Sequence, residues 1–253
     1  KLLCARSPHI TMGNLYCVEN ALSGGIWDYF DLGENIVCVN AIGENIQQRL
    51  NGCDYDSDTM LITDDKLLVN AAARYKDFFK VPVGNIKAEE KTEQTLSKLD
   101  HDTSVNKIGE IVNLSQKLNS ILWDELHKGA EEGEMLSVYE DICKLAVLSG
   151  LEIDKAKRSF ENISVSKELT MLRKKYQRPS PNFFAEIDES RSKQHAFYHT
   201  AMDDLYALVN KVHFRKGREQ YGDYLPISSS LAYDVGSGNA TEYRHKDKIV
   251  QII

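Results

Sequence analysis

The chain has 253 residues, a formal net charge of −7 at pH 7, 42% hydrophobic residues and 27% charged residues. This composition is typical of a globular protein that is large enough to bury a hydrophobic core. No segment approaches the roughly 18 consecutive apolar residues of a membrane span, so we expect no insertion into a membrane. The negative net charge argues against a surface that binds nucleic acid as a whole, although it is compatible with a local basic groove.

The cysteines are widely spaced and include no C-x-x-C pair. They are Cys4, Cys17, Cys38, Cys53 and Cys143. An odd number of cysteines without metal-binding spacing is typical of reduced thiols, so we expect a cytoplasmic protein. The chain opens on Lys1-Leu2-Leu3 as if inside a strand, without a signal peptide or an initiating methionine, and we therefore expect a fragment of a longer protein.

The predicted fold class is α+β, with a β-rich part at residues 1–65 followed by a mainly helical region at 66–216. Short β-branched or aromatic runs at 15–18, 36–39 and 60–63 are separated by glycines, which indicates a small barrel or part of one. Apolar residues then recur at helical spacing. The predicted helices cover residues 108–126, 135–148, 167–176 and 197–212, and Gly129 and Gly150 are predicted to end the first two. Residues 217–253 read as a loosely ordered tail with a final strand or short helix.

The most specific motif is the segment at residues 54–58, which we call the Asp loop. It carries Asp54, Asp56 and Asp58 in alternation. Carboxylates at this spacing converge on one point in an extended or looped segment, where three anions favour a bound divalent cation. Oxygen ligands of this kind suit Mg²⁺, which would leave positions open for phosphates and a 3′-hydroxyl. The pattern therefore predicts a site for phosphoryl transfer.

Three other interpretations of the Asp loop stay open. Acidic runs are common on solvated turns. A calcium-binding EF-hand would place Asp65 at its twelfth position, but its sixth position would hold Thr59 where the motif needs glycine. A phosphatase nucleophile should follow a buried apolar strand, whereas residues 47–52 are mostly polar. The rival function is a non-catalytic binding module whose loop binds Ca²⁺ structurally or binds no metal.

The segment at residues 51–60 resembles the active-site loop of the two-barrel RNA polymerases, with Ser57 in place of their usual glycine. Upstream, Arg6-Ser7-Pro8 is similar to the Arg-x-Pro segment of these enzymes, whose arginine lies near the incoming nucleotide. Downstream, residues 108–113, 141–146 and 153–157 look like the helices that follow the loop in silencing-type RNA-dependent RNA polymerases and in single-chain polymerases of phages and mobile elements. The resemblance covers roughly residues 1–160.

This resemblance implies two double-psi β-barrels that meet at the active site, with residues 1–65 forming much of the second. Asp54, Asp56 and Asp58 would hold Mg²⁺ for nucleotidyl transfer from NTPs to an RNA 3′-hydroxyl on a nucleic-acid template, while Arg6 and Lys157 would contact the substrate. The first barrel, with its basic groups for the triphosphate, would belong to a missing N-terminal part of the same polypeptide. The chain alone is therefore expected to be inactive.

A basic run offers a possible surface for nucleic acid. It consists of Arg173, Lys174, Lys175 and Arg178, with Tyr176 among them. Cations interleaved with an aromatic residue are typical of surfaces that track phosphates, but such a run is also typical of a solvated helix face. The pair His195 and His199 has the spacing of a zinc site on a helix, but no third ligand accompanies it, and we interpret both as surface residues.

Overall fold

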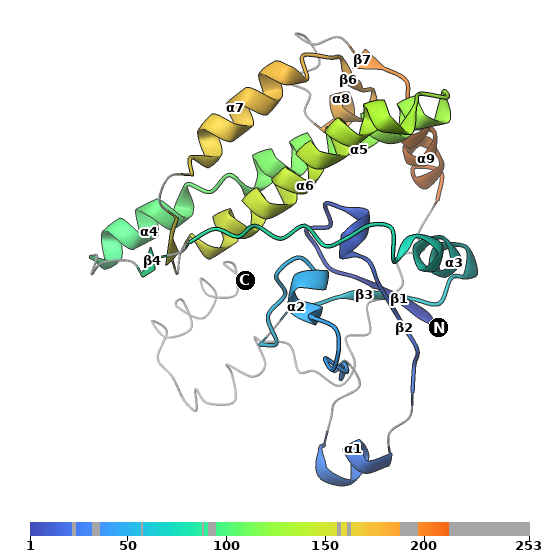
Figure 1. Ribbon diagram of the computed structural model, residues 1–253, viewed down its shortest axis with the longest axis vertical. Helices are drawn as coiled ribbons and strands as arrows, with labels where there is room; N and C mark the ends of the chain where they lie inside the picture. The colour runs from blue at the N-terminus through green and yellow to red at the C-terminus, as the bar shows by residue number, and fades with distance from the viewer. Residues whose placement is uncertain are drawn as a thin grey trace, which may run out of the picture. The chain divides into compact units, whose positions relative to one another are not determined.

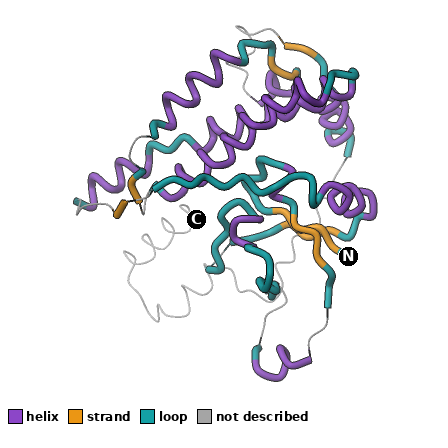
Figure 2. The backbone as a smooth tube through the Cα atoms, in the orientation of Figure 1, coloured by secondary structure: helices purple, strands orange, loops and turns teal. Residues whose placement is uncertain are grey.

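The computed structural model describes residues 1–21, 24–31, 36–56, 58–87, 89–90, 95–155, 158–160, 163–187 and 197–212. Figures 1 and 2 show a mixed α+β fold that is mostly helical and contains a small antiparallel sheet, which confirms the predicted class. The chain divides into two compact units, residues 1–207 and 208–253. The predicted tail at 217–253 lies outside the described residues, and the account below concerns the first unit.

The sheet is built around the first strand of the chain. It has the order β2-β1-β3, in which β1 (Leu2–Ala5) pairs antiparallel with both β2 (Tyr16–Val18) and β3 (Leu61–Thr63). The strands expected at 15–18 and 60–63 are thereby confirmed. Residues 36–39 are not in a strand, because no described segment pairs with them, and Ile36 and Val37 are exposed.

The central strand is covered on both faces, since successive side chains of a strand point to opposite sides. Leu3 packs with Val69 and Ala72 of α3 (Lys66–Tyr75). Cys4 joins a second cluster, which also includes Tyr16, Ile46, Leu50 and Cys53. This cluster holds α2 (Ile46–Arg49) against the other face of the sheet, immediately before the Asp loop. The packing of β1 thus fixes where the loop begins.

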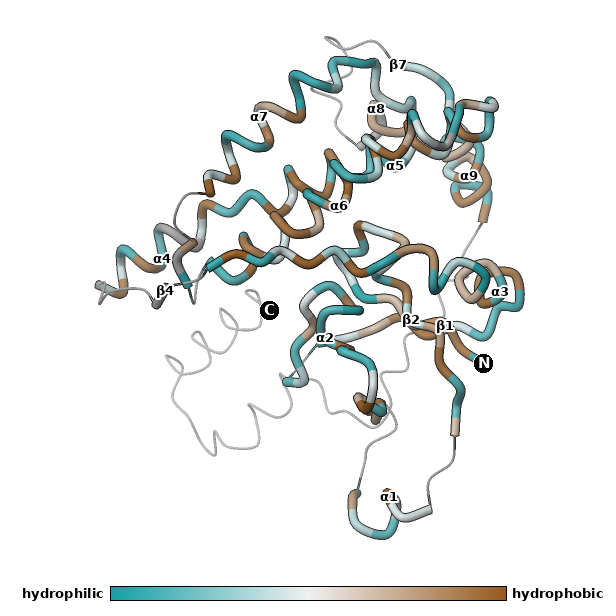
Figure 3. Tube along the Cα trace, viewed as in Figure 1, coloured by the Kyte–Doolittle hydropathy of each residue, from teal (hydrophilic) through white to brown (hydrophobic). Residues whose placement is uncertain are grey.

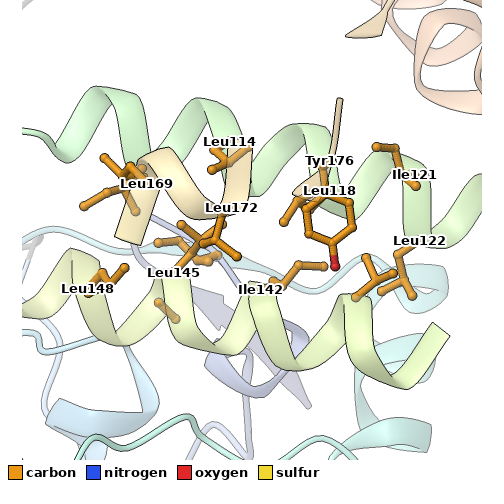
Figure 4. Close-up of a cluster of buried hydrophobic side chains, with 14 residues drawn as sticks. Leu114, Leu118, Ile121, Leu122, Ile142, Leu145, Leu148, Leu169, Leu172 and Tyr176 are labelled. Carbon is orange, nitrogen blue, oxygen red and sulfur yellow. The ribbon is translucent and has the colours of Figure 1, made fainter. Parts of the chain in front are cut away.

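The largest hydrophobic core joins α5 (Ile108–His127), α6 (Glu132–Asp154) and α7 (Val165–Lys175). Figure 4 shows its side chains projecting from the three helices toward one another, and Leu118 of α5 and Leu145 of α6 are fully buried. In Figure 3, hydrophobic residues recur along α5 and α6 at the spacing expected from the sequence. The predicted helices at 108–126 and 167–176 are confirmed.

Two predicted helix boundaries were wrong: the end of the helix expected at 135–148 and the start of the helix expected at 197–212. α6 does not end at Gly150 but continues to Asp154, because Ser149 and Glu152 are buried and extend the packed face beyond the glycine. Burial of this face offsets the cost of about 1 kcal/mol for a glycine inside a helix. Gly129 does follow the end of α5, with a φ of 92° that glycine adopts without strain.

The last described helix, α9 (Ala201–Val209), starts later than the expected position 197. The preceding pair of residues forms β7 (Phe197–Tyr198), which lies parallel to β6 (Ser180–Pro181). Asp203 then accepts hydrogen bonds from the backbone N–H groups of Thr200 and Phe183, which caps the helix. Because residues 197–198 pair with β6, the helix starts only after them, although the apolar residues from position 197 onward have helical spacing.

The remaining elements are short. They are η1 (Met12–Asn14), α1 (Gly24–Tyr29), β4 (Glu89–Glu90), α4 (Leu96–Ser104), β5 (Arg158–Ser159) and α8 (Phe183–Ile187). β4 and β5 form a two-stranded antiparallel pair. Within the described part of the chain, none of the helices combines the length and apolar character needed to cross a membrane.

Candidate functional site

A tight turn connects the C-terminal end of α2 to the Asp loop. Asn51 and Gly52 both have positive φ angles, of 55° and 73°. Glycine adopts this conformation freely, and asparagine is among the side chains that tolerate it best. The carbonyl of Gln47 accepts hydrogen bonds from the N–H groups of Gly52 at 2.7 Å and Cys53 at 3.1 Å. The start of the loop is therefore fixed to the backbone of α2.

All three aspartates of the loop are exposed residues, although the side chain of Asp58 is only 29% exposed. Asp58 reaches back along the loop, where its Oδ2 accepts a hydrogen bond of 2.7 Å from the N–H of Asp54. This contact closes the loop on itself before the chain enters β3. Asp58 is thus the aspartate that joins the two ends of the loop.

Arg6, at the end of β1, extends to the same carboxylate. Its Nε lies 2.9 Å from Asp58 Oδ2, and its Nη1 donates a hydrogen bond of 3.0 Å to the carbonyl of Asn51. The Asn51 side chain in turn donates to the carbonyl of Pro8 at 2.8 Å. The structure therefore brings together the Arg-x-Pro segment and the Asp loop, which the sequence had placed in one predicted site. Pairing of β1 with β3 explains this proximity, because Ala5 lies opposite Leu61.

A second set of contacts ties the same N-terminal segment to α2. Asn14 donates through Nδ2 to the carbonyl of Arg49 at 3.3 Å, and Arg49 donates through Nη1 to the carbonyl of Gly13 at 3.0 Å. A Cβ atom at Gly13 would lie only 2.2 Å from the carbonyl oxygen of Lys80, so no larger residue fits there. Sequence reasoning missed the roles of Asn14, Arg49 and Asn51. The Asn51-Gly52 dipeptide was the available signal, because it is typical of left-handed turns.

The donor set of the Asp loop fits a hard divalent cation, since it offers three carboxylates on one short segment. Within the described ranges, however, no three histidine, cysteine, aspartate or glutamate side chains converge closely enough to hold a metal ion. Asp58 instead faces Arg6 and the Asp54 N–H. Metal binding would require the aspartate side chains to turn toward one point, a change that their exposure permits.

Neighbouring groups are not suited to join a metal site. Asp65 accepts a hydrogen bond from the N–H of Leu68 at 3.0 Å and caps α3, and β3 lies between it and the Asp loop. This arrangement differs from a calcium loop between two helices. Burial is the main cause of a raised pKa of the Cys53 thiol, so it stays protonated and serves as a packing residue.

A shallow cavity of about 360 Å³ lies beside the Asp loop. It is lined by Ala41, Glu44, Asn45, Ile46, Gln47 and Tyr55. Tyr55 belongs to the loop itself, so the cavity and the carboxylates share a wall. Sequence reasoning did not identify this cavity, because its other walls come from the polar segment around α2.

The remaining predicted site residues lie elsewhere. Lys157 and His195 fall outside the described residues, and His199 lies 3.0 Å from the exposed carboxylate of Asp204. The basic run stands at the end of α7 and just beyond it, where it contacts acidic residues of α5 and α6. The pairs are Arg173 with Glu110 at 2.6 Å, Lys175 with Asp141 at 2.6 Å and Arg178 with Glu125 at 3.6 Å. In the described part of the chain, Lys174 forms no ion pair.

Comparison with known proteins gave no relative: no protein-family model, no curated protein and no solved structure matches this chain. We therefore infer function from the residues and contacts described above.

Proposed function

We propose that this chain is the C-terminal catalytic part of a two-barrel RNA polymerase that transfers nucleotides from NTPs to the 3′-hydroxyl of an RNA. In this proposal Asp54, Asp56 and Asp58 hold Mg²⁺, and Arg6 contacts the nucleotide. The observation that carries the proposal is the ion pair of 2.9 Å between Arg6 and Asp58. The two residues come from the two segments that resemble polymerase motifs, and these segments are far apart in the sequence.

The chemistry of the loop supports this role. A bound Mg²⁺ would neutralise phosphate charge and lower the pKa of the attacking hydroxyl. The exposed carboxylates of Asp54, Asp56 and Asp58 supply the oxygen ligands that this ion prefers. Arg6 adds a planar guanidinium with several donors, of which Nε and Nη1 are engaged with Asp58 and Asn51. Such a group beside a cation site is suited to orient a phosphate or ribose.

The three-stranded sheet is proposed to be part of the second double-psi barrel. Both faces of β1 are covered, and β3 connects the Asp loop to α3, so the loop is anchored to the sheet at both ends. The first barrel would come from a preceding part of the same polypeptide and would supply cations for the triphosphate. The template, DNA or RNA, would contact both parts. Lys157 and the basic run of α7 are proposed substrate and nucleic-acid contacts.

Metal binding by the isolated chain is the first test. Mn²⁺ substitutes for Mg²⁺ and broadens the NMR signals of nearby nuclei, so we expect selective broadening of the amide signals of residues 54–58. Asp56→Ala should abolish this broadening, whereas Asp64→Ala, at an exposed aspartate just outside the loop, should leave it intact. Broadening that persists in Asp56→Ala would argue against the proposed ligand set.

Catalysis is the second test, performed on the longer polypeptide that carries both barrels. Asp56→Ala should abolish Mg²⁺-dependent NTP incorporation without changing the circular dichroism spectrum, while Asp64→Ala should incorporate normally. Normal incorporation by Asp56→Ala would overturn the polymerase proposal.

A second candidate is a non-catalytic binding module, which the Asp58 contacts favour. The carboxylate of Asp58 has partners in Arg6 and in the Asp54 N–H, so a purely structural role in closing the loop accounts for it without a metal. Titration with Ca²⁺ distinguishes the two candidates. A loop that binds Ca²⁺ and ignores Mg²⁺ and Mn²⁺, or that binds none of them, would favour the binding module.

A further inference from the structure

The cavity beside the Asp loop has the size of a small-molecule site. Its volume of about 360 Å³ lies at the lower end of the range of roughly 300–1,000 Å³ that such sites occupy. Tyr55 forms one wall and stands between Asp54 and Asp56 in the chain, so a ligand in the cavity would also be next to the carboxylates. The other lining residues belong to α2 and to the segment just before it.

Tyr55 presents an aromatic ring to solvent, with 64% of its surface exposed. A ring in this position can stack on a planar ligand, and stacking favours ligands with an extended π-system. Ile46 also borders the cavity, but it is only 1% exposed and packs into the core, so Tyr55 supplies the apolar surface. The wall formed by Tyr55 thus suits a planar face.

The charges of the lining argue against a phosphate or a cation in the cavity itself. Among the described residues that line it there is no lysine or arginine, and the charged one, Glu44, is paired with Arg49 at 3.0 Å. The remaining polar groups are the side-chain amides of Asn45 and Gln47, which offer both donors and acceptors. The Asn45 Oδ1 already accepts from the Gln48 N–H at 3.0 Å. The lining therefore suits a neutral heteroaromatic ring with a hydrogen-bonding edge.

Hydrogen bonds fix the backbone that leads from α2 to Tyr55. The carbonyl of Gln47 accepts the N–H groups of Gly52 and Cys53, which lead directly into the Asp loop and Tyr55. Because these bonds already exist without a ligand, little conformational freedom would be lost when the cavity is filled. The backbone at the base of the two walls is thus ordered in advance.

We propose that this cavity is a nucleobase subsite, in which Tyr55 stacks on the base and the amides of Asn45 and Gln47 bond its edge. The identity of the ligand rests on the proposed function: the base would belong to a nucleotide whose phosphates face the Asp loop. Binding of the base itself requires no metal, because none of the described lining residues is a predicted metal ligand. Stacking tolerates different bases, so purines and pyrimidines should both bind, purines more tightly.

Titration of the ¹⁵N-labelled full chain with adenosine and with uridine, in metal-free buffer, tests this inference. We expect adenosine to shift the backbone amide of Tyr55 and the side-chain amides of Asn45 and Gln47. Tyr55→Ala should raise the adenosine Kd by about tenfold, whereas Tyr55→Phe, which keeps the ring, should stay within about twofold of wild type. Tyr29→Ala is the matched control, because Tyr29 is an 83% exposed tyrosine that does not line the cavity.

Two results would overturn the subsite: absence of shifts at the lining residues at millimolar adenosine, or an unchanged Kd in Tyr55→Ala. The Mn²⁺ titration described above gives an independent readout without nucleoside. Adenosine binding without Mn²⁺ broadening would overturn the metal site alone. Mn²⁺ broadening without adenosine binding would overturn the nucleobase subsite alone.

Discussion

Arg6 and Asp58 form an ion pair in which Arg6 Nε lies 2.9 Å from Asp58 Oδ2. The side chains are 12% and 29% exposed, so the pair is shielded from solvent more than a typical surface pair. Arg6 also donates to the carbonyl of Asn51, at the other end of the segment that contains the Asp loop. One arginine therefore links the end of β1 to Asp58 and to the turn that precedes the Asp loop.

Replacing Arg6 should lower the stability of the chain. Arg6→Gln leaves the carboxylate of Asp58 without its cation in a partly buried position, and we expect a loss of about 1–3 kcal/mol in the free energy of unfolding, measured by urea denaturation. Arg178→Gln is the control, because Arg178 is 58% exposed and lies 3.6 Å from Glu125. Its loss should stay below about 1 kcal/mol. Equal losses in the two variants would contradict the structural importance of Arg6.

The stability of the chain should depend on both the side chain and the backbone conformation of Asn51. Asn51→Gly keeps the φ of 55° without strain but removes the donor to the Pro8 carbonyl, at an expected cost of about 1–2 kcal/mol. Asn51→Ala removes the same donor and adds the cost of a Cβ in the left-handed region, about 1 kcal/mol more. Urea denaturation of both variants checks this order. A more stable Asn51→Ala would show that the turn relaxes to another conformation.

Tyr176 should make stability depend on pH above 10. Burial, followed by a hydrogen bond to Asp141, raises the pKa of Tyr176 to about 12 from an ordinary value of 10. Between these values the folded state keeps a proton that the unfolded state has lost, so stability is complete below pH 10 and falls as the pH rises toward 12. Urea denaturation of Tyr176→Phe from pH 9 to 12 should show a shallower fall than wild type.

The control for this pH dependence is Tyr29→Phe, at a tyrosine that is 83% exposed. Its stability should fall with pH as steeply as that of the wild-type chain. The slope, and not the stability at one pH, is the quantity to compare, because Tyr176→Phe also loses the bond of 2.7 Å to Asp141. Parallel slopes for wild type and Tyr176→Phe would contradict the raised pKa.

The three-helix core should respond strongly to the loss of a buried side chain. Leu118 of α5 is 0% exposed within this core, so Leu118→Ala should cost about 2–5 kcal/mol of unfolding free energy. Leu136→Ala on α6 is the control, since Leu136 is 57% exposed and its replacement should cost less than about 1 kcal/mol. Thermal unfolding monitored by circular dichroism at 222 nm, where helices dominate the signal, provides the measurement. A small effect of Leu118→Ala would mean that α5 and α6 pack in another way.

The helices at 108–127 and 165–175 were predictable because their stability depends on one apolar face, which leaves a regular spacing in the sequence. The extension of α6 beyond Gly150 was not predictable from spacing, because it depends on burial of Ser149 and Glu152 against the rest of the fold. The late start of α9 depends on Asp203, whose partner Phe183 lies on another element. Boundaries set by distant partners leave no local signal.

The same limit applies to the candidate site. The residue types of the Asp loop were visible in the sequence, and the resemblance to polymerases placed Arg6 near it. Neither could reveal the hydrogen bond from Asn51 to Pro8 or the cavity lined by Tyr55, because both depend on how α2 packs against the sheet. The carboxylate partners of the basic run were also invisible, since Glu110 and Asp141 belong to other helices.

A polyanion that binds at the end of α7 would compete with the ion pairs that join this helix to α5 and α6. Arg173 and Lys175 are the cations through which α7 contacts Glu110 of α5 and Asp141 of α6. A phosphate that took either cation would break one contact of α7, although Glu110 would keep its ion pair with Lys107 and Asp141 its hydrogen bond from the Tyr176 hydroxyl. RNA that contacts these two residues would therefore compete with ion pairs that hold α7 against α5 and α6, whereas Lys174 has no ion pair with any described residue that RNA would have to break.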